Sequence, residues 1–292
     1  MRILKCTCYV LIIFVVIAGA FLYKGDLPKE IVDAKYSSEQ SRFLDVASGA
    51  RIHYRDEGNS AGAPLVLIHG SNASLHTWQP WVARLGDDYR IITLDLPGHG
   101  LTGRTPNDDY SSAAFVSIID AVVTHLGVDD FLLGGNSMGG GATWRYALAH
   151  PQKVNAMMLI DASGPPQWWR ERDSAVEVED KGRPLAFTLL LKPWFRAIAR
   201  YLDPYMLIVQ GAGAAYNNSP VVDQALIDRY YELSIREGTR DATMARFGSF
   251  SRNMDETIDL SVLTQPTLIM WGALDGVIPA NIADKFDAIL PN

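Results

Sequence analysis

Cysteine is nearly absent from this chain of 292 residues, which contains only Cys6 and Cys8. Both lie close to the N-terminus, and their spacing of two positions is poorly suited to a disulfide between them. The rest of the chain therefore relies on neither disulfides nor cysteine-bound metal, and an oxidising compartment would not disturb it. We expect no metal and no other cofactor.

The sequence also lacks an excess of positive charge. Its 26 Lys and Arg residues stand against 33 Asp and Glu, which gives a formal net charge of −7. Proteins that bind nucleic acids neutralise phosphates with basic residues, so we expect no nucleic-acid partner. Internal repeats and low-complexity segments are absent as well. A hydrophobic content of 48% is enough for a sizeable core, in one large domain or two small ones.

Charge is missing from one N-terminal stretch, Cys6 to Tyr23, which follows Arg2 and Lys5. Its 18 residues are near the lower limit for a helix that spans a bilayer. Basic residues ahead of such a stretch favour a cytoplasmic N-terminus. We therefore predict a membrane anchor over residues 1–24 and an extracytoplasmic main domain.

Two alternatives to the anchor stay open. The small residues Ala18, Gly19 and Ala20 suit a signal peptidase, so cleavage near Ala20 would leave a secreted or periplasmic protein. A buried helix of a soluble domain is the third interpretation. In each case residues 25–41 are interpreted as a polar linker.

The motif Gly-Asn-Ser-Met-Gly occupies residues 135–139. It follows the apolar run Phe131 to Leu133 and precedes a helix-forming stretch, Gly140 to His150. Strand, sharp turn and helix are the context in which Gly-x-Ser-x-Gly forms a nucleophile elbow. The glycines allow strand and helix to approach closely, while the serine projects from a strained turn. We predict that Ser137 is a nucleophile and that the backbone amide of Met138 faces a developing oxyanion.

Further apolar runs end in polar or glycine-containing turns, and they alternate with amphipathic stretches, as expected for βαβ units around a parallel sheet. They cover residues 64–70, 89–95, 154–161 and 266–275, with Leu-Pro-Gly-His-Gly at 96–100. In this order the motifs resemble the α/β-hydrolase family from about Arg42 onwards. The resemblance implies a mostly parallel sheet flanked by helices, with a core of residues 42–164 and 265–292 and a helical lid, 165–264, inserted after the sixth strand.

The lid segment has amphipathic and aromatic stretches of its own. Apolar residues at helical spacing predict a basic, aromatic helix over Leu185 to Leu202, and a second amphipathic helix over Asp223 to Glu237. Residues 211–220 are expected to form a loop or hinge. We expect most of the aromatic side chains to pack the lid onto the core, and some to line an apolar acyl or aryl pocket.

The chain order of the catalytic residues in this family is Ser, then Asp or Glu, then His. Asp275, just after the strand at 267–271, is the predicted acid, and Asp161 is the alternative. No histidine follows Asp275, and His76 is the upstream histidine placed over the expected site. We therefore interpret the sequence as truncated, without the last strand, the base and a closing helix.

The second oxyanion donor implied by the resemblance is the backbone amide of Ser71, after His69 and Gly70, with Asn72 as the alternative. A His-Gly-Gly-Gly loop is not present, which disfavours an enzyme for bulky tertiary-alcohol esters. Serine at position 137 disfavours haloalkane dehalogenases and epoxide hydrolases of this fold, which use aspartate there.

These features predict a metal-free serine hydrolase that acts on a small apolar ester or ketone. Cleavage of a carboxylic ester is the first interpretation. The second is a carbon–carbon bond hydrolase of the meta-cleavage type, because Gly-Asn-Ser-Met-Gly-Gly resembles the elbow of that group, although its Gly-Pro-Gly oxyanion loop is missing. The third is a non-catalytic binding protein that keeps the fold without a base.

Overall fold

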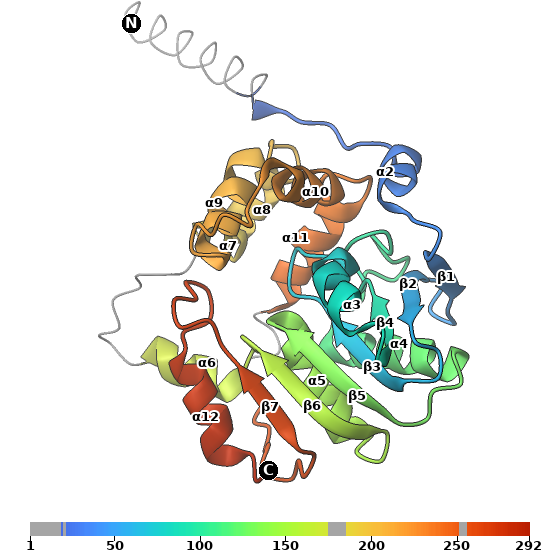
Figure 1. Ribbon diagram of the computed structural model, residues 1–292. Helices are drawn as coiled ribbons and strands as arrows, with labels where there is room; N and C mark the ends of the chain where they lie inside the picture. Colours follow the sequence, from blue (N-terminus) through green and yellow to red (C-terminus); the bar gives the residue numbers. More distant parts are fainter. Residues whose placement is uncertain (1–18, 20–21, 175–184, 251–255) are drawn as a thin grey trace, which may run out of the picture.

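The computed structural model describes residues 19, 22–174, 185–250 and 256–292, and within them a seven-stranded sheet forms the centre of the molecule (Figure 1). The strands follow the order β1-β2-β4-β3-β5-β6-β7. Strand β2 pairs antiparallel with β1 and β4, and the pairs from β4 across to β7 are parallel. The predicted mostly parallel sheet is confirmed. The strands are β1 Arg42–Asp45, β2 Arg51–Gly58, β3 Ala63–Ile68, β4 Tyr89–Leu94, β5 Phe131–Asn136, β6 Val154–Ile160 and β7 Thr267–Met270.

The central strands are apolar because both of their faces are covered. Successive side chains of a strand point to opposite faces, so Val66 and Ile68 of β3 face one side, and Leu65 and Leu67 the other. The first pair belongs to the main core, which contains helices α4 Ser112–His125, α5 Met138–Ala149 and α12 Asn281–Ile289. The second pair packs with Trp78 and α3 Gln79–Leu85, which follows the short helix η1 Leu75–Trp78.

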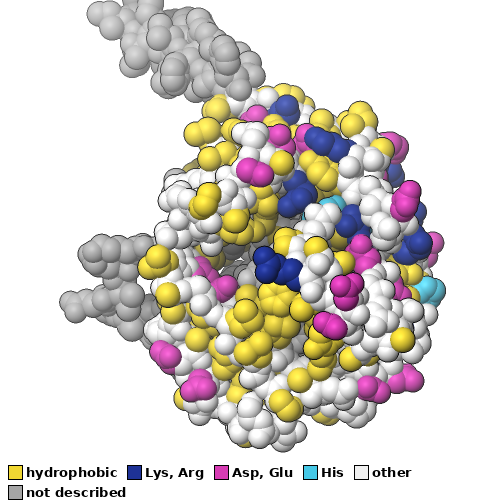
Figure 2. Space-filling view, viewed as in Figure 1, with side chains coloured by type: hydrophobic (Ala, Val, Ile, Leu, Met, Phe, Trp, Pro, Cys, Tyr) yellow, Lys and Arg dark blue, Asp and Glu magenta, His cyan; other side chains and the backbone are white. Residues whose placement is uncertain are grey.

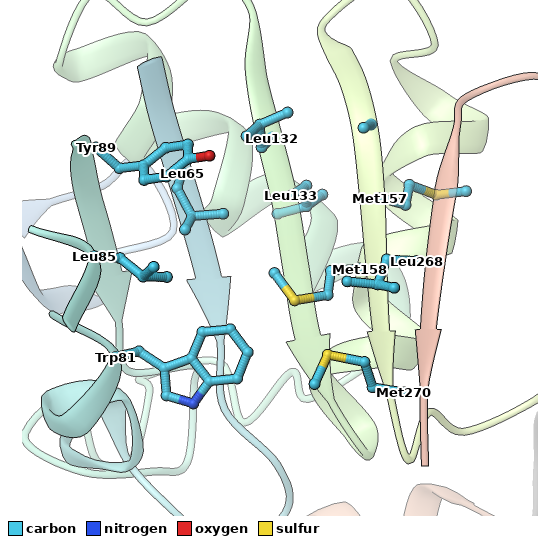
Figure 3. Close-up of a pocket in the computed structure, with 11 residues that line it drawn as sticks. Leu65, Trp81, Leu85, Tyr89, Leu132, Leu133, Met157, Met158, Leu268 and Met270 are labelled. Carbon is cyan, nitrogen blue, oxygen red and sulfur yellow. The ribbon is translucent and has the colours of Figure 1, made fainter. Parts of the chain in front are cut away.

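An open apolar groove lies on the face of the sheet that α3 covers, between this helix and β7 (Figure 3). It encloses about 410 Å³, and Leu268 and Met270 of β7 on its wall are 55% and 38% exposed. In the space-filling view, hydrophobic side chains gather over this part of the molecule (Figure 2). None of the predicted site residues lines the groove within the described part of the chain. The lining consists of Leu65, Trp81, Leu85, Tyr89, Leu132, Leu133, Ala156, Met157, Met158, Leu268 and Met270.

A helical insertion separates β6 from β7 in sequence. Helices α7–α11 lie together above the ends of β5 and β6, whereas α6 lies beside α12 (Figure 1). The helices are α6 Pro166–Ser174, α7 Leu185–Leu190, α8 Pro193–Ala199, α9 Tyr205–Ala215, α10 Gln224–Ser234 and α11 Thr239–Phe250. The insertion therefore lies on the side of the sheet where parallel strands end.

Two sequence expectations for the insertion need correction. The single helix expected over Leu185 to Leu202 is two helices, because Pro193 lacks an amide donor and begins α8 instead of continuing α7. The loop expected from residue 211 begins later, since Gly211 and Gly213 lie inside α9. Packing of Leu207 with Leu190 and Phe195 outweighs the low helix propensity of glycine. Helix α10 follows the prediction for residues 223–237, with Asp223 as its N-cap.

The segment interpreted as a linker, residues 25–41, is not a free polar connection. It contains helix α2 Lys29–Tyr36, whose Val32 is buried beside Leu101 and Leu233. Asp33 accepts two hydrogen bonds from Arg236, at 2.6 and 2.9 Å, and Asp26 accepts one from Arg240 at 2.7 Å. The polar residues that suggested a linker are thus ion-pair partners of the insertion.

Among the described residues, no helix combines the length and the hydrophobicity needed to cross a bilayer. Most of the predicted anchor, residues 1–24, lies outside the described residues.

Candidate active site

Ser137 occupies a strained turn between β5 and α5. Its backbone has φ 54° and ψ −116°, a conformation that non-glycine residues rarely adopt. Small neighbours make the turn possible: a Cβ on Gly135 would lie 2.3 Å from the carbonyl oxygen of Gly139, and a Cβ on Gly139 would lie 2.2 Å from that of Ile68. The elbow is therefore closed against the end of β3, and it holds the Ser137 side chain, half-buried, at the carboxyl edge of the sheet.

The two predicted oxyanion residues meet beside this turn. Met138 is the first residue of α5, where a backbone amide has no partner within the helix. Ser71 follows Gly70, which approaches so closely that a Cβ there would lie 3.2 Å from Cβ of Ser137. Among the described residues, neither the Ser71 nor the Met138 amide donates a hydrogen bond to another group. Two unsatisfied donors next to a serine hydroxyl are the arrangement that stabilises a developing oxyanion.

The two candidates for the acid lie after the strands that follow β5 in the sheet, Asp161 after β6 and Asp275 in the loop after β7. Asp161 follows β6 with φ 44° and accepts a hydrogen bond from the Gly272 amide at 2.7 Å. Asp275 accepts from the amides of Val277 and Ile278, at 2.6 and 3.0 Å. Burial raises the pKa of each carboxyl group, and the adjacent carboxyl group of Asp275 raises the pKa of Asp161 further. The structure thus places Asp275, the predicted acid, next to Asp161, the alternative.

Two buried histidines near the elbow, His69 and His99, hydrogen-bond backbone groups and not Ser137. His69 Nδ1–H donates to the Gly70 carbonyl at 2.7 Å, and its Nε2 accepts from the Leu96 amide at 3.0 Å, so both nitrogens of the neutral ring are used. His99 Nδ1–H donates to the Pro97 carbonyl at 3.0 Å. Burial lowers the pKa of both rings. These two histidines hold the loops after β3 and β4 in place.

His76, the upstream candidate for the base, belongs to a different contact. Its Nε2–H donates to the carbonyl of Tyr36 at 3.0 Å, and its Nδ1 accepts from the Ser74 hydroxyl at 3.0 Å. Burial lowers its pKa to about 4, and the nearby Arg55 guanidinium acts in the same direction. A ring whose nitrogens both bind groups other than Ser137 is not placed to take the proton of Ser137.

The other three histidines are structural as well. His53 Nδ1–H donates to Asp95 at 2.7 Å inside the core, while the rings of His125 and His150 pack against Tyr54 and Tyr146. None of the six histidines of the chain hydrogen-bonds Ser137 in the described structure. The described residues also contain no group of three His, Cys, Asp or Glu side chains placed to hold a metal ion.

One residue of the site was missed by sequence reasoning. Arg246 of α11 reaches from the insertion to the oxyanion loop, where it donates to Ser71 Oγ and Asn72 Oδ1, both at 2.6 Å, and lies 3.8 Å from Met138 Sδ. No local motif marks this arginine, because its partners lie more than 100 positions away in sequence. Only the folded chain shows that it forms a wall of the site.

Comparison with known proteins agrees with this geometry. The model of the α/β-hydrolase fold family matches residues 63–292, and the chain therefore belongs to that family. The fold is that of a hydrolase family, and similar proteins include an esterase, a lipase and a meta-cleavage product hydrolase, together with the acetyltransferase component of an acetoin-cleaving system.

Three similar proteins illustrate the range. The pimeloyl-[acyl-carrier protein] methyl ester esterase of Aliivibrio salmonicida is 29% identical, over 82% of this chain and 84% of that protein. The 2-hydroxy-6-oxononadienedioate/2-hydroxy-6-oxononatrienedioate hydrolase of Cupriavidus pinatubonensis is 26% identical, over 89% and 88%. The crystal structure of an esterase from Rhodococcus sp. ECU1013 aligns with a TM-score of 0.64 and 27% identity, over 86% of this chain and 87% of that one.

Proposed function

We propose that the protein is a serine esterase that cleaves a carboxylic ester of a small apolar alcohol or acid. The observation that carries the proposal is the position of Ser137, in a strained elbow beside the free amides of Ser71 and Met138. These groups supply a nucleophile and an oxyanion hole, and both are needed for acyl transfer.

In the proposed reaction, the Ser137 hydroxyl attacks the ester carbonyl as a base removes its proton. The carbonyl oxygen becomes an oxyanion held by the two amides, and the alcohol leaves with a proton to give an acyl-enzyme. Water then attacks the acyl-enzyme and releases the acid. Asp275 is proposed to orient a histidine base. None of the six histidines of this chain hydrogen-bonds Ser137 in the described structure, so none of them is placed to be that base.

A carbon–carbon bond hydrolase is the second candidate. It is supported by the Gly-Asn-Ser-Met-Gly-Gly elbow and by 26% identity to the hydrolase of Cupriavidus pinatubonensis. In this reaction the same oxyanion hole would hold a ketone oxygen. The two candidates differ in the bond that breaks, so turnover of a vinylogous diketone against that of a simple ester separates them.

The insertion between β6 and β7 is proposed to act as a lid. Its helix α11 reaches the oxyanion loop through Arg246, and its exposed aromatic and apolar residues include Trp194, Ile198 and Met206. A lid of this kind would exclude water from the acyl-enzyme and line the pocket for an apolar group.

The test of the esterase proposal is covalent labelling with a fluorophosphonate, which reacts with activated serines. In a chain that also carries the histidine base, we expect labelling of Ser137 and none in the Ser137→Ala variant, with Ser249→Ala as a control that keeps its labelling. The alanine variant should also lose hydrolysis of short-chain nitrophenyl esters. Labelling that persists in Ser137→Ala would exclude the elbow as the site of chemistry, and a chain that carries the base and still never reacts would support a binding role.

We also propose that residues 1–24 attach the protein to a membrane and leave the main domain outside the cytoplasm. The support is the order of Arg2 and Lys5 ahead of an uncharged stretch. Full-length protein should be found in the membrane fraction, and protease added from outside should digest its main domain. A variant without residues 1–24 is the control. Intact full-length protein in the soluble cytoplasm would contradict the anchor, while a secreted, shortened chain would favour cleavage near Ala20.

A further inference from the structure

Arg246 brings a positive charge to the wall of the oxyanion hole. Its guanidinium spans the two residues whose amides face the reacting carbonyl, with Nη1 at 2.6 Å from Ser71 Oγ and at 3.8 Å from Met138 Sδ. The second terminal nitrogen donates to Asn72 at 2.6 Å. Its guanidinium also lies over the ring of Phe247, 5.0 Å from the centroid. The partners of this cation among the described residues are thus a hydroxyl, an amide oxygen, a thioether and an aromatic ring, none of which carries charge.

Three other arginines of the insertion, unlike Arg246, form ion pairs with carboxylates. Arg236 pairs with Asp33, Arg240 with Asp26, and Arg200 with Asp241. Within the described residues, no carboxylate pairs with Arg246. Its Nε–H is also buried without a hydrogen-bond partner. In the part of the chain that the structure describes, this guanidinium therefore has no carboxylate partner and has an unused donor.

Such an arrangement is costly unless something completes it. Removing a cation from water without an anion carries a desolvation penalty, and burial lowers the pKa of Arg246 to about 10. The side chain is still charged at neutral pH. The planar fork of a guanidinium matches the two oxygens of a carboxylate, and such charge-assisted hydrogen bonds are about twice as strong as neutral ones.

We propose that Arg246 binds a carboxylate carried by the substrate, so that the enzyme acts on an acid-bearing ester or ketone and not on a wholly apolar one. This inference rests on the proposed function and names its substrate class. The anion takes the place of the neutral contacts to Ser71 and Asn72 and uses the free Nε–H. A half-ester of a short dicarboxylic acid carries both groups that such a site would hold, an ester carbonyl and a carboxylate.

The experiment measures binding in the Ser137→Ala background, where turnover does not interfere. Titration calorimetry compares monomethyl adipate, which carries one carboxylate, with dimethyl adipate, which carries none. The Arg246→Gln substitution should raise the Kd of monomethyl adipate about tenfold or more. It should change the Kd of dimethyl adipate less than about twofold. Arg246→Lys should fall between, because it keeps the charge and loses the fork.

Arg84→Gln is the control for net charge. Arg84 is exposed in the last turn of α3, where the chain turns back towards the start of β4, away from the carboxyl edge of the sheet. It should leave both Kd values unchanged. If Arg246→Gln raises the Kd of both ligands equally, Arg246 only supports the structure of the oxyanion loop, and the proposal is overturned. Failure of monomethyl adipate to bind the Ser137→Ala protein would overturn it as well. Fluorophosphonate labelling of the proteins that retain Ser137 tests the esterase proposal separately, since it needs no carboxylate.

Discussion

The carboxyl groups of Asp161 and Asp275 meet at the carboxyl edge of the sheet, although the whole helical insertion separates them in sequence. The loop after β7 joins them, because its Gly272 amide donates to Asp161 while Asp275 binds the amides of Val277 and Ile278. Burial raises the pKa of both carboxyl groups. For a carboxyl group, a raised pKa means that folding favours the protonated form, so this pair stabilises the protein at low pH and loses that contribution as the pH rises through the folded-state pKa.

The two carboxyl groups should differ in their effect on catalysis. In a chain that hydrolyses esters, Asp275→Asn should lower kcat by a factor on the order of 10⁴, because the histidine base loses the group that orients it. Asp161→Asn keeps an oxygen that can accept from Gly272 and should lower kcat less than tenfold. Steady-state kinetics with a nitrophenyl ester measures both. If Asp161→Asn has the larger effect, the acid lies at the end of β6.

No histidine of the described structure hydrogen-bonds Ser137, and we expect this to limit activity. A protein of these 292 residues should hydrolyse esters at or near the background rate, because loss of a triad member costs several orders of magnitude. A longer chain that adds a strand beside β7 and a histidine next to Asp275 should gain both kcat and thermal stability, since β7 is then paired on both edges. Equal rates for the two proteins would place the base among the six histidines described above, and His76→Ala would be the first variant to measure.

The elbow should tolerate no side chain at position 135. Gly135→Ala would place its methyl group 2.3 Å from the Gly139 carbonyl oxygen and 2.6 Å from Thr143 Oγ1, so the backbone must shift. We expect a loss of about 3 kcal/mol in the free energy of unfolding, the cost of overpacking a rigid site. Gly211→Ala is the matched control: it lies inside α9 with open space around its Cβ and should be neutral or gain about 1 kcal/mol. Urea denaturation measures both, and a similar loss for the two variants would contradict the prediction, because the close contacts of the elbow would then not be the cause of the loss.

His76 should make the stability of the protein depend on pH. Its pKa is lowered from an ordinary 6.5 to about 4, so between these values the unfolded chain binds a proton that the folded chain does not. The free energy of unfolding therefore falls as the pH drops through this window, by about 2 kcal/mol between pH 7.5 and pH 5 from this group alone.

His76→Gln tests this dependence, since glutamine keeps a donor and an acceptor for Tyr36 and Ser74. Urea titrations at the two pH values should show a smaller fall in the variant than in the parent protein. A fall of the same size in both would assign the pH dependence to the other buried groups, which include His69 and His99.

The sequence by itself determined the features whose cause is local. The elbow at 135–139 is readable because a serine with positive φ needs glycines at fixed offsets, and the parallel strands are readable because both of their faces are buried. Asp223 as an N-cap and Pro193 as a helix start are local in the same way, although Pro193 was overlooked as the break between α7 and α8.

Tertiary structure decided what depends on partners distant in the chain. The segment that contains α2 resembles a linker in sequence because its polar residues meet their ion-pair partners only in the folded insertion. Lys35 pairs with Glu232 of α10, Asp33 with Arg236 in the connection between α10 and α11, and Asp26 with Arg240 of α11. In sequence, nothing distinguishes Arg246 from the other arginines of the insertion, and its role becomes visible only when α11 is placed on the oxyanion loop. The meeting of Asp161 and Asp275 depends on the pairing of β6 with β7, which forms across the insertion. Such contacts carry no signal in the neighbouring residues, because their energy comes from burial and charge pairing between elements and not from the conformation of either one.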